Sequence, residues 1–156
     1  MAVSPIPQGY HTATPYLVVH DAEAALAFYT KAFGAVETVR LVSPGEGKIM
    51  HAEFKIGDSM FMLSNEFPEM GLVSPKTLGG SSISIHLYVE AVDDAVAHAI
   101  DVGAAEVRPL QDQFYGDRSA TLKDPFGHQW SISSRIEELT EEEIMSRFAQ
   151  MMQSSG

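Results

Sequence analysis

The chain has 156 residues and a mass of 17.0 kDa, which fits one domain or two small fused halves. Its 10 basic and 21 acidic side chains give a formal charge of -11, so its surface repels phosphate backbones and anionic lipids. We therefore expect neither nucleic acid nor a membrane as a partner. The lack of cysteine excludes disulfides, thiolate nucleophiles and Cys-ligated metal centres.

Hydropathy along the chain gives an expectation about location. No apolar run approaches the roughly 20 residues of a membrane helix. The first ten residues lack the basic and then apolar pattern of a signal peptide. We therefore expect a cytoplasmic protein.

The first half of the chain predicts a strand, a helix and further strands. A β-branched and aromatic run predicts a strand over Tyr16–Val19. Asp21 as N-cap and Gly34 as C-cap bracket a helix over Ala22–Phe33, where apolar residues recur at helical spacing. Two more strands, split by a short turn, are predicted over residues 50–56 and 60–63.

The same order returns about 70 residues later, which indicates an internal repeat. Residues 83–89 predict a strand, and Asp93 is expected to cap a helix over residues 94–102. Three strands are then predicted, over residues 106–109, 119–123 and 129–133. The alternative is that two unrelated strand-helix units merely share Asp caps and terminal Gly residues.

Two segments lie outside the repeat. The Gly, Ser and Pro-rich stretch around residues 71–81 predicts a linker between the halves. Thr140 and Glu143 form a capping box that opens a terminal helix over residues 140–152. The apolar stripe of this helix is expected to dock on the core or to contact a second subunit.

Six short segments carry a family pattern: PYLVV at residues 15–19, AFY at 27–29, AFGA at 32–35, MHAE at 50–53, IGDS at 56–59 and DPFGHQW at 124–130. Over about residues 12–145 they resemble the PhnB-like branch of the vicinal oxygen chelate superfamily, which includes glyoxalase I, bleomycin-resistance proteins and extradiol dioxygenases.

This resemblance implies an α+β fold of two tandem βαβββ modules, whose curved mixed sheets surround a cavity, followed by a C-terminal helix. It implies a single glyoxalase-like domain over residues 1–156, commonly assembled as a homodimer. The modules are expected over about residues 12–66 and 82–135, with the linker over about 67–81 and the terminal helix over about 140–152.

Enzymes of this superfamily hold a divalent metal with one His or Glu on the first and last strand of each module. Carried over on the matching motifs, the resemblance places these four positions at Thr14, Met62, Ser84 and Ser131. Hydroxyl and thioether groups are poor ligands for Zn, Ni, Mn or Fe(II). We therefore expect no metal at these positions and no cofactor, and we assign no catalytic residue.

Alternation along the strands predicts which side chains line the cavity. In residues 83–89 the odd positions are apolar, so the even positions face the cavity. The same reasoning on the other strands gives a polar and aromatic face with flexible thioethers, made of Tyr16, His51, Glu53, Met60, Met62, Ser64, Ser84, His86, Tyr88, Ser131 and Ser133.

Such a face suits a small organic molecule. The loop over residues 113–118 adds Tyr115 and also Arg118, whose guanidinium can grip a carboxylate or phosphate. The net charge of -11 favours a cationic ligand. We therefore predict a metal-free binding protein for a small aromatic or cationic compound.

Other interpretations stay open. His51, Glu53 and His86 can be relocated ligands of a metal-dependent lyase, isomerase or dioxygenase, and the first two can also be a base and its orienting group or a plain surface pair. Alternatively, the chain is a dimeric interaction module without a small ligand. Met60, Met62, Tyr115 and Arg118 also have purely structural interpretations. His128, beside a predicted turn, is expected to be solvent-exposed.

Overall fold

The structure is a computed structural model that describes residues 2–155 and divides them into two units. Unit 1 comprises residues 2–82 and 125–128, and unit 2 comprises residues 83–124 and 129–155. Each unit is built around a four-stranded mixed sheet. The predicted α+β fold of two βαβββ modules and a C-terminal helix is confirmed.

Unit 1 has the strand order β1-β4-β3-β2, in which β1 and β4 are parallel and the other pairs are antiparallel. Its elements are β1 (Tyr16–Val19), α1 (Ala22–Phe33), β2 (Val36–Val42), β3 (Ile49–Ile56), β4 (Ser59–Asn65), the 3-10 turn η1 (Pro68–Met70) and α2 (Pro75–Leu78).

Unit 2 repeats this topology with the order β5-β8-β7-β6, in which β5 and β8 are the parallel pair. Its elements are β5 (Ser84–Tyr88), α3 (Val92–Val102), β6 (Ala105–Asp112), β7 (Asp117–Lys123), β8 (Gln129–Arg135) and α4 (Glu141–Ser154). Among the described residues, no helix is long and apolar enough to cross a membrane.

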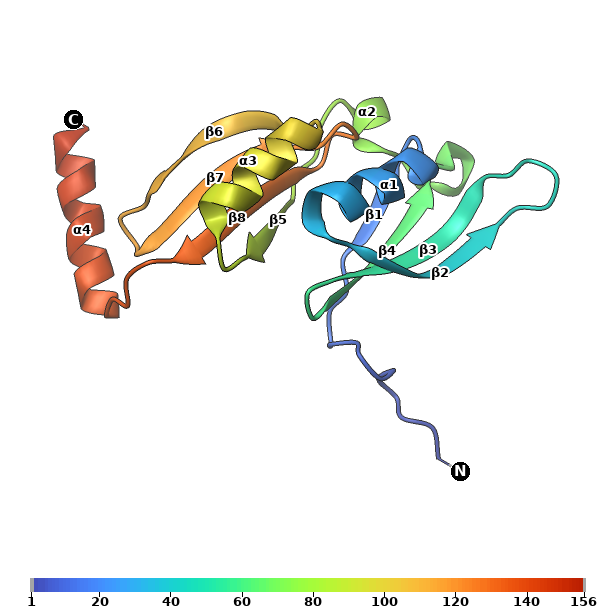
Figure 1. The fold of residues 1–156 in the computed structure, drawn as a ribbon, viewed down its shortest axis with the longest axis horizontal. Helices are drawn as coiled ribbons and strands as arrows, with labels where there is room; N and C mark the ends of the chain where they lie inside the picture. Colours follow the sequence, from blue (N-terminus) through green and yellow to red (C-terminus); the bar gives the residue numbers. More distant parts are fainter. Residues whose placement is uncertain (1, 156) are drawn as a thin grey trace. The chain divides into compact units, whose positions relative to one another are not determined.

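In each unit a helix packs on one face of the sheet, α1 in unit 1 and α3 in unit 2 (Figure 1). The strand residues facing the helix are apolar and buried, as with Phe54 and Leu63 in unit 1 and Trp130 and Ile132 in unit 2. Because strand side chains alternate, the residues between them point to the opposite face. We call this opposite face the open face of each unit.

The ends of α1 are as predicted. The carboxylate of Asp21 accepts a hydrogen bond from the Ala24 backbone N–H, which satisfies one of the free donors of the first turn. Gly34 adopts a left-handed conformation and closes the helix. At α4, the Thr140 hydroxyl accepts a hydrogen bond from the Glu143 backbone N–H.

The predicted cap of α3 is wrong. The helix begins at Val92, so Ala91 is the cap residue and Asp93 lies within the first turn. The Asp93 carboxylate there binds the guanidinium of Arg118. An acidic residue in the first turn stabilises a helix through the helix dipole, just as an acidic N-cap stabilises its first turn. The sequence alone therefore does not show which of the two positions Asp93 occupies.

Some elements are absent from the residue-based prediction. Every residue of β2 is exposed, so the strand shows no alternation of buried and exposed positions. The predicted linker contains α2, with Ser74 as its N-cap. No residue of α4 is buried, so this helix does not dock on the core.

His128 is buried, against the expectation that it is exposed. The turn that contains it belongs to unit 1, where its Nε2 lies 3.0 Å from the backbone oxygen of Val18. Phe126, in the same turn, packs against the rings of His20 and Tyr29. Residues 125–128 therefore contribute to the core of unit 1.

Candidate functional site

A row of polar side chains crosses the open face of unit 2. In the strand register, Arg108 on β6 is opposite Thr121 on β7, Thr121 is opposite Ser131 on β8, and Ser131 is opposite His86 on β5. Side chains at directly opposite positions share one face of a sheet. The sheet therefore presents a guanidinium, two hydroxyls and an imidazole in one line.

A second row consists of the next residues along the strands on the same face, two positions further along β5 and β8. Gln111 on β6 is opposite Ser119 on β7, and Ser119 is opposite Ser133 on β8, which is opposite Tyr88 on β5. The Ser119 side chain is buried and makes no hydrogen bond with another described residue. Ser119 also lines the hollow described next, so its hydroxyl is available to a ligand.

The first row, together with Gln111 and Ser119 of the second, forms the floor of a hollow of about 360 Å³, a size that suits a small organic molecule. Its walls come from the loop after β6 and from α4. The lining residues are His86, Arg108, Gln111, Gln113, Phe114, Tyr115, Ser119, Ala120, Thr121, Ser131 and Met151. No Asp or Glu is among them.

The wall of this hollow carries the apolar groups. The rings of Phe114 and Tyr115 meet edge to face at 5.1 Å between centroids, and Phe148 of α4 lies 5.6 Å from Phe114. The Arg147 guanidinium donates to the Phe114 backbone oxygen and pairs with Glu137, which fixes α4 beside the loop. One side of the hollow is therefore aromatic, and Met151 adds a flexible thioether.

The arginines of this region differ in their partners. Arg118, predicted as a ligand grip, donates from Nε and Nη2 to Asp93 and from Nη1 to Asp112, at 2.9 to 3.0 Å. These bonds raise its pKa and lower that of the Asp93 carboxyl. Arg108 lines the hollow and forms no ion pair with any described residue. Arg108 is therefore the cation available to a ligand.

Tyr88 and Asp117 form a polar pair on the same open face. The Tyr88 hydroxyl donates to Oδ2 of the buried Asp117 carboxylate at 2.9 Å. This hydrogen bond, with a smaller effect of burial, raises the pKa of Tyr88. The ring of Tyr88 also lies 4.9 Å from that of His86, which places an aromatic surface next to the hollow.

Three predicted site residues come together on the open face of unit 1. The Tyr16 hydroxyl lies 3.1 Å from Nδ1 of His51, and Nε2 of His51 lies 2.7 Å from the Glu53 carboxylate. Both ring nitrogens of His51 therefore have protein partners. Met62 is opposite both Tyr16 and Glu53 in the register, and the neighbouring Met60 is buried.

The positions that the resemblance implies for a metal offer poor donors. Thr14 and Met62 lie in unit 1, and Ser84 and Ser131 lie in unit 2. Their hydroxyl and thioether groups do not fit a divalent transition metal. Among residues 2–155 there is also no group of three or more His, Asp or Glu side chains that could hold a metal ion. We therefore derive no chemistry through a metal.

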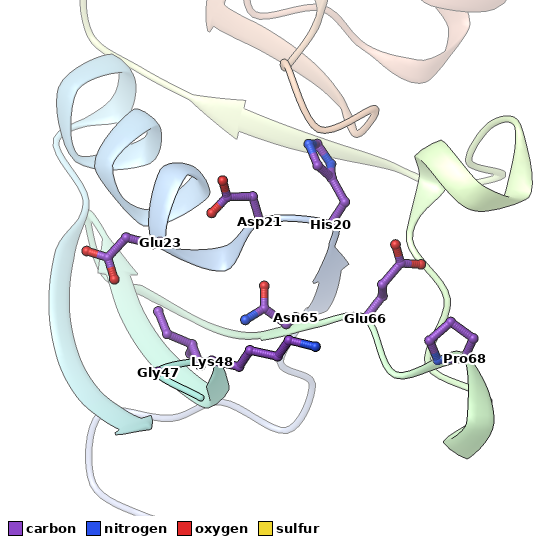
Figure 2. Close-up of a pocket in the computed structure, with 9 residues that line it drawn as sticks. His20, Asp21, Glu23, Gly47, Lys48, Asn65, Glu66 and Pro68 are labelled. Carbon is purple, nitrogen blue, oxygen red and sulfur yellow. The ribbon is translucent and has the colours of Figure 1, made fainter. Parts of the chain in front are cut away.

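Unit 1 has a larger hollow of about 560 Å³ where β1 and β4 end and α1 begins (Figure 2). Three of its polar side chains already have structural roles. Asp21 caps α1, and Asn65 accepts from the Ala22 backbone N–H at 2.8 Å. Glu66 accepts from Thr77 and Ser74, and the Thr77 hydrogen bond is the main cause of its lowered pKa. This hollow is therefore a weaker candidate than the one in unit 2.

Sequence reasoning missed several lining residues of the unit 2 hollow. The alternation in β6 is broken at Pro109, and the register shifts between Arg108 and Gln111. In a regular strand, residues three positions apart face opposite sides, but this bulge lets Arg108 and Gln111 face the same side. The only signal in the sequence is a proline inside a strand, which marks a bulge without saying which side chain it turns.

Comparisons with known proteins agree with this fold. A sequence model of the Glyoxalase/Bleomycin resistance protein/Dioxygenase superfamily matches residues 10–132. An uncharacterized protein of Mycobacterium bovis is 41% identical over 136 residues, which are 85% of this chain and 89% of that protein.

Solved structures also match. The PhnB protein from Bacillus cereus is 21% identical with a TM-score of 0.63, over 80% of this chain and 99% of its own. A mutant of the fosfomycin resistance protein FosX from Listeria monocytogenes, complexed with Mn(II) and a dihydroxypropylphosphonic acid, is 18% identical with a TM-score of 0.63, over 88% of this chain and 97% of its own. At these identities the likeness shows a shared fold.

Proposed function

Because the chain belongs to the glyoxalase/bleomycin resistance protein/dioxygenase superfamily, as its motifs predicted, we propose that it is a PhnB-like member that binds a small organic ligand without a metal. The ligand lies on the open face of unit 2. There it contacts the polar rows of the sheet and the aromatic loop over residues 113–115.

The hollow of about 360 Å³ is the observation that carries this proposal. Its floor is a sheet, so the donor groups are held by regular strand pairing and lose little freedom when a ligand binds. Its wall offers the Phe114 and Tyr115 rings, on which a flat ligand can pack. A rigid polar floor with an apolar wall is the common form of a small-molecule site.

The four positions that the family resemblance implies for a metal support a metal-free mode. FosX has the same fold and was solved with Mn(II). Here the corresponding donors are two serines, a threonine and a methionine, which favour neither Mn(II) nor Zn. Direct hydrogen bonds from the sheet therefore replace coordination as the means of holding the ligand.

The test is a thermal-shift screen of small organic fragments on freshly purified protein, with and without a chelator. We expect some fragments to raise the melting temperature equally in both conditions. Ser131→Phe fills the hollow and should abolish these shifts, whereas the control Ser59→Phe, on β4 of unit 1, should keep them. A screen without any stabilising fragment, or shifts that require added metal, would refute the proposal.

A further inference from the structure

We propose that the ligand of the unit 2 hollow is a small organic anion, a carboxylate or phosphonate on an aromatic or apolar body, and that Arg108 binds its charged group. This inference rests on the proposed function, since it names the ligand class of the same site. The proposed ligand is negatively charged, whereas the net charge of -11 on the chain favours a positively charged one.

Arg108 is a cation that forms no ion pair among residues 2–155. Of the four other arginines, three pair with carboxylates: Arg40 with Glu23 and Glu37, Arg118 with Asp93 and Asp112, and Arg147 with Glu137. Arg135 also forms no ion pair with a described residue, but it does not line the hollow. In a chain with 21 acidic and 10 basic residues, carboxylates are plentiful. Arg108 nevertheless has no carboxylate partner among the described residues and lines the hollow. An external anion is a natural partner for such a guanidinium.

Neighbouring groups of the hollow add donors of the same kind. Thr121 and Ser131 follow Arg108 in the transverse row, their hydroxyl oxygens 3.3 Å apart, and His86 ends the row. The free hydroxyl of Ser119 lies in the adjacent row. Hydroxyl groups can donate to the several oxygens of a carboxylate or phosphonate while the guanidinium neutralises its charge.

The lining of the hollow has no carboxylate that could pair with a cationic ligand. No Asp or Glu lines it. The nearby buried carboxylate of Asp117 already accepts the Tyr88 hydroxyl. A cation placed beside Arg108 would be repelled at short range without a carboxylate to compensate.

The apolar lining of the hollow indicates what the body of the ligand is. Phe114, Tyr115 and Met151 line it with two rings and a thioether. A bare inorganic anion would leave this surface uncovered. An anion that carries a ring can contact both the polar and the apolar lining at once.

The net negative charge of the chain repels an anion, whereas Arg108 attracts it, and the distance over which each charge acts decides which effect is larger in the bound state. At physiological salt, interactions between exposed charges are largely screened beyond roughly 8 Å. The acidic surface therefore slows the approach of an anion more than it weakens the bound state, in which the guanidinium is in direct contact.

The experiment compares four probes of similar size by NMR titration: benzoate, phenylphosphonate, benzylamine and benzyl alcohol. We expect the two anions to bind more tightly than the cation and the neutral alcohol. Arg108→Gln should weaken anion binding by about tenfold or more, as expected for the loss of a charge-assisted contact, and change benzyl alcohol binding less than about twofold. Arg108→Lys should retain part of the affinity.

The matched control is Lys55→Gln, which removes one positive charge from β3 of unit 1 and should leave all four affinities unchanged. Tighter binding of benzylamine or benzyl alcohol would overturn the inference while the proposed function stands. Anion binding that Arg108→Gln does not weaken would overturn it as well. If none of the four probes binds, the inference fails, and the proposed function fails with it only if the fragment screen also finds no stabilising compound.

Discussion

Ser64 on β4 and Ser133 on β8 occupy equivalent places in the two sheets, and each buries its hydroxyl completely. Neither hydroxyl has a hydrogen-bond partner among the described residues. Burying an unpaired hydroxyl costs roughly 1–3 kcal/mol relative to water. Replacing either serine by alanine removes that cost and leaves a void of only one oxygen atom.

For Ser133→Ala we therefore predict an increase of about 0.5–2 kcal/mol in the free energy of unfolding, after a small penalty for lost packing. For a chain of this size, each 1 kcal/mol corresponds to roughly 2–4 °C in melting temperature. Ser64→Ala is expected to behave alike. Most core substitutions destabilise, so a gain at both sites is an unusual result.

The assay is urea unfolding followed by fluorescence of Trp130, the single and fully buried tryptophan, which reports on unit 2. Circular dichroism follows both units. Ser131→Ala is the control on the same strand, since its hydroxyl faces that of Thr121 at 3.3 Å, and this change should be neutral or mildly destabilising. A loss of more than about 1 kcal/mol in Ser133→Ala would refute the reasoning.

Three further predictions concern the surroundings of the hollow. Gly116→Ala should lower stability by roughly 2 kcal/mol or more, measured by urea unfolding, because φ is +97° and an added Cβ would lie 2.8 Å from the Glu137 backbone oxygen. The hydrogen bond to Asp117 raises the pKa of Tyr88. The stabilisation of the fold by this hydrogen bond is therefore present below the usual tyrosine pKa and is lost as the pH rises through the folded-state pKa. The stability difference between the wild type and Tyr88→Phe should shrink above about pH 10. Arg118→Gln should cost less than about 1 kcal/mol and leave ligand affinity unchanged in the NMR titration, because its ion pairs are largely exposed.

Much of the fold follows from local sequence patterns. The N-cap Asp21, the left-handed Gly34 and the strand alternation around Trp130 each depend on neighbouring residues, and the structure agrees with all three. β2 was not predicted, because it is exposed along its whole length and shows no alternation of buried and exposed residues. The burial of His128 was not predicted, because it depends on a contact with Val18, 110 positions earlier in the chain.

The candidate site was harder to predict. Alternation identified His86 and Ser131, whose strands are regular. It could not identify Arg108, because the bulge after Pro109 changes which residues share a face. Arg118 has the right chemistry for an anion but is held by two carboxylates that only the folded chain brings to it.

The most direct test of the central claim is a ¹H–¹⁵N NMR titration of the wild-type protein with phenylphosphonate in excess chelator. We expect saturable shifts at His86, Ser119, Thr121 and Ser131, together with the loop over residues 113–115. Shifts that are absent in chelator and return only with added Mn(II) would contradict it, as would saturable shifts confined to residues of unit 1.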